Sequence, residues 1–156
     1  MIRAILLTLL LISCAGVKLD QRIINQMSMI EIAEVGSIQE AMLYQRLFHI
    51  LRSAGDTKYL LEFKINYHQN DIGLSKESDI IRKGITQVIN FKLTNKEDDR
   101  VLLKRTIVMR SSYSLATDAM VSYAQLDSNK NFLAINGADK IYAHLIIYFK
   151  SMFDKL

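Results

Sequence analysis

The chain has no proline and no tryptophan, and only one cysteine and six glycines among its 156 residues. A lone cysteine cannot form a disulfide within the chain, so the stability of the fold must come from core packing. Half of the residues are hydrophobic. With so little proline and glycine, this content excludes the compositions typical of disordered chains. Length and composition together predict one folded domain with a sizeable core.

Motifs of catalysis and of metal or nucleotide binding are also missing from the sequence. The three histidines, His49, His68 and His144, stand in no HExxH pattern, and there is no CxxC pair. The sequence contains no GxSxG elbow and no glycine-rich phosphate loop. We therefore predict a protein that is not an enzyme and that has no metal site and no dissociable cofactor.

The charge balance is mildly basic, with a formal net charge of +4 and a pI near 9.2. Such a balance suits an anionic partner, for example lipid head groups or phosphates. Specialised nucleic-acid-binding domains usually carry a denser basic stripe than this chain has. We therefore expect no nucleic-acid partner.

Residues 1–13 have the pattern of a secretory signal peptide. Arg3 provides a short positive region, and Ala4–Ile12 is apolar except for Thr8. This stretch is too short for a membrane-spanning helix, which needs roughly 20 residues. The alternative is a buried or amphipathic first helix, but the stretch has no polar face.

The end of this segment, Leu11-Ile12-Ser13-Cys14, resembles the lipobox of bacterial lipoproteins. The resemblance implies a diacylglycerol on the Cys14 sulfur, cleavage before Cys14, and an acyl chain on the new amino group. An unmodified cysteine is the alternative. Several acyl chains anchor a protein firmly, because each buried methylene contributes roughly 0.8 kcal/mol. Ala15 resembles the residue that follows the cysteine in lipoproteins sent to the outer membrane.

Hydrophobic periodicity predicts the secondary structure of the mature chain. We expect a lipidated tether at 14–26 and a single domain at 27–156. The expected elements, in chain order, are a strand at 27–35, a helix at 37–54, strands at 58–68, 81–94 and 100–113, an irregular stretch at 114–128, and a helix over 132–152. This β-α-β-β-β-α order predicts an α+β fold: a two-layer sandwich with a four-stranded, mainly antiparallel sheet and two helices on one face.

Each expected helix has a candidate core stripe. Ser37 and Glu40 form a capping box for the first helix, and Gly55 is placed to close it. Its expected core residues are Ile38, Ala41, Met42, Leu47, Phe48, Ile50 and Leu51. Those of the last helix are Phe132, Ile135, Ala138, Ile141, Leu145, Tyr148 and Met152. Gly137 is expected to weaken the first turns of that helix.

The solvent-facing side of the sheet is the candidate binding surface. Alternation along the strands places six basic residues on it, with Glu62 as the main negative charge. These residues are Lys58, Lys64, Arg82, Lys92, Lys104 and Arg110. Lys76 stands at the expected hairpin tip between the second and third strands. The surface is either a solubilising sheet face or a face that binds anions or a partner protein.

The lipobox, the element order and two tracts of sequence resemble the lipopolysaccharide-assembly lipoproteins, an LptE-like family, and are closest to alphaproteobacterial members. The tracts are "KRTIVMRSSYSL" and "SYAQLDSNKNFLAINGADKIYAHLIIYF". The resemblance implies an outer-membrane lipoprotein, lipid-anchored at the periplasmic face, that assembles with and plugs an LptD-like β-barrel and assists lipopolysaccharide transport. It also implies that Lys76 meets lipid A phosphates.

Two other functions remain open at this stage. One is an auxiliary lipoprotein of a lipid ABC transporter, which can share a small α/β fold. The other is a lipid-anchored hydrolase, for which the sequence offers no catalytic residues.

Overall fold

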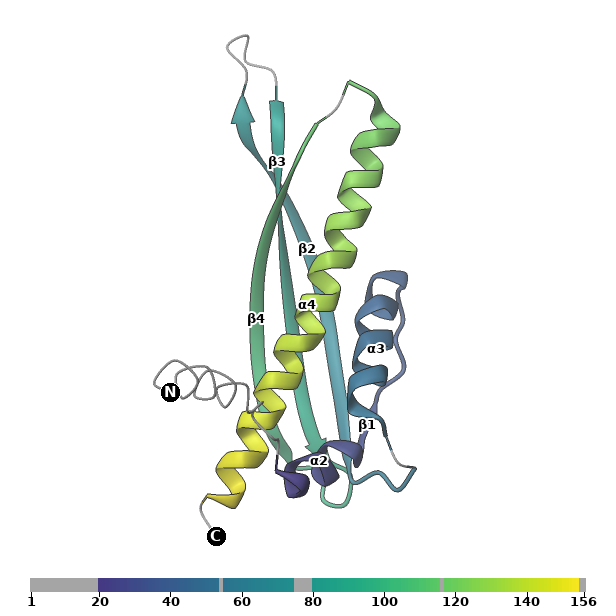
Figure 1. Cartoon of the computed structure of the whole chain (residues 1–156), viewed down its shortest axis with the longest axis vertical. Coiled ribbons are helices and arrows are strands. Elements are labelled where there is room, and N and C mark those ends of the chain that lie inside the picture. Colours follow the sequence, from purple (N-terminus) through teal and green to yellow (C-terminus); the bar gives the residue numbers. More distant parts are fainter. Residues whose placement is uncertain (1–19, 54, 75–79, 116, 155–156) are drawn as a thin grey trace, which may run out of the picture.

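The computed structural model describes residues 20–53, 55–74, 80–115 and 117–154. The elements are α2 (Gln21–Ser28), β1 (Ile30–Ile32), α3 (Ile38–Leu51), β2 (Tyr59–Leu74), β3 (Ile80–Asn95), β4 (Val101–Ser114) and α4 (Ala119–Phe153). The strands form one sheet in the order β1-β2-β3-β4, in which only β1 pairs in parallel. Helices α3 and α4 pack together against one face of the sheet (Figure 1). The predicted two-layer α+β fold is confirmed. Cys14, the signal segment and Lys76 lie outside the described residues.

The N-terminal part of the domain differs from the prediction. The expected strand at 27–35 is only three residues long, and the end of the expected tether forms the helix α2. Asp20 caps this helix by accepting from the backbone N–H of Arg22, at 2.9 Å. Ile23 and Met27, one helical turn apart, are both buried. This spacing of four residues, rather than alternation, decides the local structure.

The strands β2 and β3 are longer than predicted. They remain paired from Tyr59↔Asn95 to Asp71↔Lys83 and beyond, although the sequence of β2 turns polar after position 68. The polar residues are held by cross-strand contacts. For example, the Tyr113 hydroxyl donates to Gln69 Oε1 at 3.0 Å. In β2, the alternation of apolar and polar residues therefore ends before the hydrogen-bonded pairing with β3 ends.

The helix α4 begins at Ala119, within the stretch that the sequence predicts to be irregular. Asp118 provides the N-cap and accepts from the Met120 N–H at 2.8 Å. The first turns are exposed on most sides, so they lack the apolar stripe by which a helix is recognised in a sequence. The prediction of an irregular segment at 114–128 is wrong for residues 119–128.

The capping of α3 confirms one half of the predicted capping box. Ser37 accepts from the Glu40 N–H at 3.3 Å. The Glu40 carboxylate instead accepts from the Ile65 N–H of β2, at 3.4 Å. The helix ends at Leu51, and its C-cap is Arg52, which adopts the left-handed conformation with φ 50°, so Gly55 is not the cap.

The helices bury part of each predicted stripe. In α3, Leu47 and Leu51 are buried as predicted, together with Leu43, whereas Ile38 is 89% exposed and Phe48 is 55% exposed. In α4, Ala138, Ile141 and Leu145 are buried as predicted, whereas Phe132, Ile135 and Met152 are exposed. The buried residues of α4 are Leu133, Ala134, Gly137, Ala138, Ile141, Leu145 and Phe149. This stripe contains the small residues, which let the helix axis approach the sheet closely.

Gly137 lies in the middle of α4, not in its first turns, and it is buried. A methyl group at this position would collide with the Ile89 side chain and would lie 3.2 Å from Met109 Cε and 3.3 Å from Gln87 Oε1. Glycine at this position therefore lets α4 pack close to the side chains of the sheet.

A small ion-pair cluster attaches β1 to the turn between β3 and β4. Lys96 Nζ lies 2.6 Å from a Glu31 carboxylate oxygen, to which the Thr57 hydroxyl also donates at 2.9 Å. The hydrogen bond from Lys96 and then that from Thr57 hold the pKa of Glu31 below its ordinary value. This cluster positions the edge strand β1.

Replacing Gly137 by alanine is expected to destabilise the protein by about 1–2 kcal/mol, because overpacking outweighs the higher helix propensity of alanine. Gly36→Ala is the matched control, since a methyl group at that position would meet nothing within 4 Å. Urea denaturation measures both free energies of unfolding. A Gly137→Ala variant at least as stable as the parent would contradict the packing argument.

The Lys96→Met variant is expected to raise the pKa of Glu31 towards its ordinary value, which carboxyl-detected NMR titration measures. A lowered native pKa stabilises the fold above the unfolded-state pKa, and this stabilisation is lost as the pH falls through the native pKa. The stability difference between parent and variant should therefore disappear in acid. An unchanged Glu31 pKa in the variant would show that Lys96 does not set it.

Candidate binding surface

The sheet face opposite α3 and α4 carries the candidate residues in cross-strand rows. Four rows, each running from β2 through β3 to β4, are Glu62–Lys92–Lys104, Lys64–Asn90–Thr106, Asn66–Val88–Val108 and His68–Thr86–Arg110. Most of these side chains are exposed. We call this surface the open face. The predicted alternation of core-facing and solvent-facing residues is therefore confirmed along most of the sheet.

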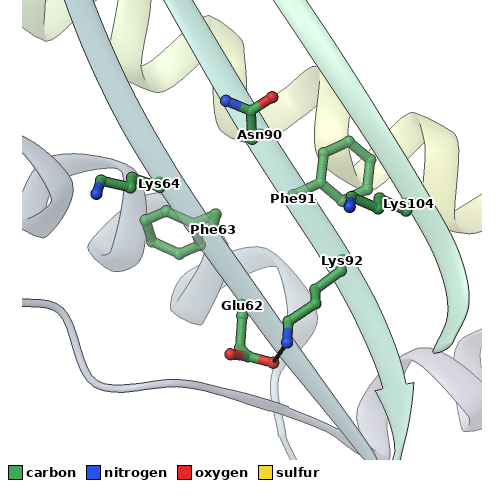
Figure 2. A pocket seen from close by; sticks show the side chains of 7 residues that line it. All are labelled: Glu62, Phe63, Lys64, Asn90, Phe91, Lys92 and Lys104. Atoms are coloured by element: carbon green, nitrogen blue, oxygen red, sulfur yellow. Dashed lines mark ion pairs between the residues drawn. The ribbon is translucent and has the colours of Figure 1, made fainter. Parts of the chain in front are cut away.

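Three of the predicted basic residues, together with Glu62, Phe63, Asn90 and Phe91, line a shallow depression of about 250 Å³ (Figure 2). Lys64 comes from β2, Lys92 from β3 and Lys104 from β4. Lys92 pairs with Glu62 across the strands at 2.8 Å. Because both partners are partly exposed, this ion pair contributes at most about 1 kcal/mol and can exchange for another anion.

The remaining groups at the depression leave positive charge and hydrogen-bond donors available. Within the described part of the chain, neither Lys64 nor Lys104 forms an ion pair. The Thr106 hydroxyl donates to Asn90 Oδ1 at 2.7 Å, which orients the Asn90 amide nitrogen as a donor. Each ammonium group, and the amide donor, can bind a phosphate or a carboxylate oxygen.

Arg82 and Arg110 do not join this cluster. Arg110 lies six residues along β4 from Lys104, a distance of about 20 Å. Arg82 lies opposite Ser114, and its guanidinium donates to the Ser112 hydroxyl at 2.7 Å. The predicted basic surface is therefore a cluster of three lysines at one end and two separate arginines towards the other.

Arg105 is a basic residue of this region that the sequence reasoning missed. It lies in the core-facing register of β4, opposite Phe91, yet its side chain is exposed. Its guanidinium donates to the Lys104 carbonyl oxygen at 3.2 Å. A charge at a core-facing position is itself a signal, because such residues are typical of edge strands.

A buried polar contact lies on the helix side of the sheet, beside Gly137 of α4. Gln87 is fully buried, and its amide donates to the Tyr67 hydroxyl at 2.7 Å. Burial raises the pKa of Tyr67, and the bond from Gln87 partly opposes this rise. These groups lie on the helix side of the sheet, so they do not belong to the open face.

Other kinds of site are not found in the described part of the chain. Within residues 20–53, 55–74, 80–115 and 117–154, no three side chains of the metal-binding types lie close enough together to hold an ion. Over the same residues, the helices lack the combination of length and apolarity that a membrane span needs.

Comparison with known proteins gives one sequence relative and several structural ones. No family model matches the chain. An uncharacterised protein of Rickettsia prowazekii (strain Madrid E) is 25% identical over 120 residues, which are 77% of this chain and 76% of that protein.

Several solved structures of bacterial lipoproteins resemble this chain. A candidate lipoprotein from Caulobacter crescentus CB15 aligns with a TM-score of 0.68 and 17% identity, over 83% of this chain and 96% of that one. Rare lipoprotein B from Shewanella oneidensis aligns with a TM-score of 0.55 and 12% identity, over 81% and 92%. A minor lipoprotein from Acinetobacter baumannii aligns with a TM-score of 0.54 and 14% identity, over 76% of this chain and 88% of that one. The chain therefore has the fold of these bacterial lipoproteins.

Proposed function

We propose that this chain is an outer-membrane lipoprotein, lipid-anchored through Cys14 at the periplasmic face. In this proposal it assembles with and plugs an LptD-like β-barrel and assists lipopolysaccharide transport, as a binding protein rather than an enzyme. The carrying observation is that a chain with a lipobox at Cys14 has a fold shared with bacterial lipoproteins over most of its length. The β-barrel and the lipopolysaccharide are proposed as partners because of the resemblance to the LptE-like family.

The position of α2 supports an anchor at one end of the molecule. Asp20, just before α2, follows Cys14 by six residues, so the tether reaches at most about 21 Å. Helix α2 lies beside the C-terminal end of α4, where the Arg22 guanidinium stacks 5.1 Å from the centre of the Phe153 ring (Figure 1). A lipid on Cys14 would hold this end of the domain near the membrane surface.

The opposite end of the sheet would lie far from the anchor. β2 and β3 are each 16 residues long, which corresponds to about 50 Å. The open face runs along this length, with Lys64, Lys92 and Lys104 nearer the anchored end and Arg82 nearer the far end. A phosphate-bearing lipid that moves along the face would meet basic groups at both ends. By the family resemblance, Lys76 is a further candidate for contact with lipid A phosphates.

Recovery of the partner from native membranes tests the assembly role. After crosslinking in cells, affinity purification of this chain should recover an LptD-like β-barrel, identified by mass spectrometry. A Cys14→Ala variant should leave the outer-membrane fraction, because it lacks the lipidated sulfur. Recovery of a transporter without any barrel would instead support the auxiliary transporter role.

Binding of lipopolysaccharide tests the three-lysine cluster. Glu62→Gln should strengthen binding and Lys64→Gln should weaken it, each by about two- to fivefold, since exposed charge pairs contribute up to about 1 kcal/mol. Lys140→Gln, an exposed change on α4, is the control. Isothermal titration at fixed salt measures the affinities. If Lys140→Gln weakened binding as much as Lys64→Gln, general charge and not the cluster would be responsible.

A further inference from the structure

The two edges of the sheet differ in how they are protected. On one side, β1 pairs with the first residues of β2, and the Ala33 N–H donates to the Leu61 carbonyl at 2.9 Å. Further along β2, the Glu40 carboxylate of α3 accepts from the Ile65 N–H. On the other side, β4 is the last strand, and within the described residues no strand pairs with its outer edge over its 14 residues. Its outward main-chain groups can therefore accept another strand.

The side chains of β4 define what kind of strand fits. Its sequence, VLLKRTIVMRSSYS, contains no acidic residue, and Lys104, Arg105 and Arg110 are all exposed. None of the three forms an ion pair with the described residues. Val108, between them, is 50% exposed. The edge is a cationic strand with an uncovered apolar residue at its centre.

We propose that β4 binds an acidic, extended segment of a partner protein, which adds antiparallel to it as a fifth strand. The partner places carboxylates opposite Lys104 and Arg110 on the open face and a further carboxylate opposite Arg105 on the helix side. A β-branched residue opposite Val108 covers its exposed surface. Cross-strand pairs of this kind stabilise antiparallel sheets, and main-chain bonds at a free edge supply affinity.

Charge and spacing favour this occupant over two others. A second copy of the chain would bring two cationic strands together, and an uncompensated charge of this sign opposes such pairing. A single phosphate cannot span Lys104 and Arg110, which lie about 20 Å apart along the strand. A phosphate would also leave Val108 exposed. The inference needs only the edge itself and does not depend on the β-barrel proposed above.

A synthetic peptide tests the proposal directly. A nine-residue threonine-rich peptide is made with glutamates at the positions opposite Arg110, Arg105 and Lys104 and valine opposite Val108. It should bind the full-length lipidated chain in detergent, as measured by fluorescence anisotropy. A peptide with lysine in place of glutamate should not bind.

Methylation of peptide nitrogens separates strand addition from simple charge attraction. Along an added strand, every second peptide N–H donates to β4 and the others point away from it. Methylating the nitrogens that face β4 should abolish binding, whereas methylating those that point away should leave the affinity unchanged. If both methylated peptides bound as well as the parent, the interaction would be electrostatic only, and strand addition would be overturned.

Charge reversal identifies the residues. The double variant Lys104→Glu, Arg110→Glu should lose about tenfold or more in affinity for the acidic peptide and should gain affinity for the lysine peptide. The double variant Lys140→Glu, Lys150→Glu changes the net charge equally at exposed positions of α4, away from β4, and should bind normally. Equal losses in both variants, or no binding of the acidic peptide by the parent, would overturn the proposal. Peptide binding without recovery of a barrel would contradict only the proposed function.

Discussion

The close approach of α4 to the sheet is the constraint on which the rest of the structure depends. Ala134, Gly137 and Ala138 form the contact, and the space beside Gly137 is filled by Ile89, Met109 and Gln87. Small residues at this crossing let one long helix cover much of the sheet. Because α3 and α4 both lie on this side, the apolar residues of the strands are buried there.

The open face and the free edge of β4 follow from this one-sided packing. Side chains that point away from the helices have no core to enter, so most of them are polar or charged, and Val88 and Val108 are exceptions. Lys104 belongs both to the three-lysine cluster and to the cationic edge, because β4 is at once part of the open face and the end of the sheet. A lipid phosphate at the cluster and an acidic strand at the edge would therefore compete for the same ammonium group.

The strands were predictable because each side of the sheet has a distinct environment. Leu61, Ile65 and Ile89 alternate with polar neighbours, and this period of two places them correctly in the core. The helical core was less predictable, because α4 is apolar on more than one side. Phe132 and Ile135 form as good a stripe in sequence as Leu133 and Ala134, and only packing against the sheet decides between them.

The sequence predicts on which side of the sheet the candidate residues lie, but not which of them lie near one another. Alternation places Lys64, Lys92 and Lys104 on one side, whereas their position around one depression depends on the register between three strands. The free edge of β4 could not be derived from alternation, since strand order is a property of the whole fold. The local sequence feature that indicated an edge strand was Arg105, a charged residue at a core-facing position.

The central claim is that the open face and the edge of β4 are the working surface, and that the outer face of α4 is not. A photo-crosslinking amino acid at position 64 or 108 in native cells, compared with one at position 147 on exposed α4, tests this claim most directly. The account predicts crosslinks to lipopolysaccharide or a partner protein from positions 64 and 108 and few from position 147. Crosslinks from position 147 alone would contradict it.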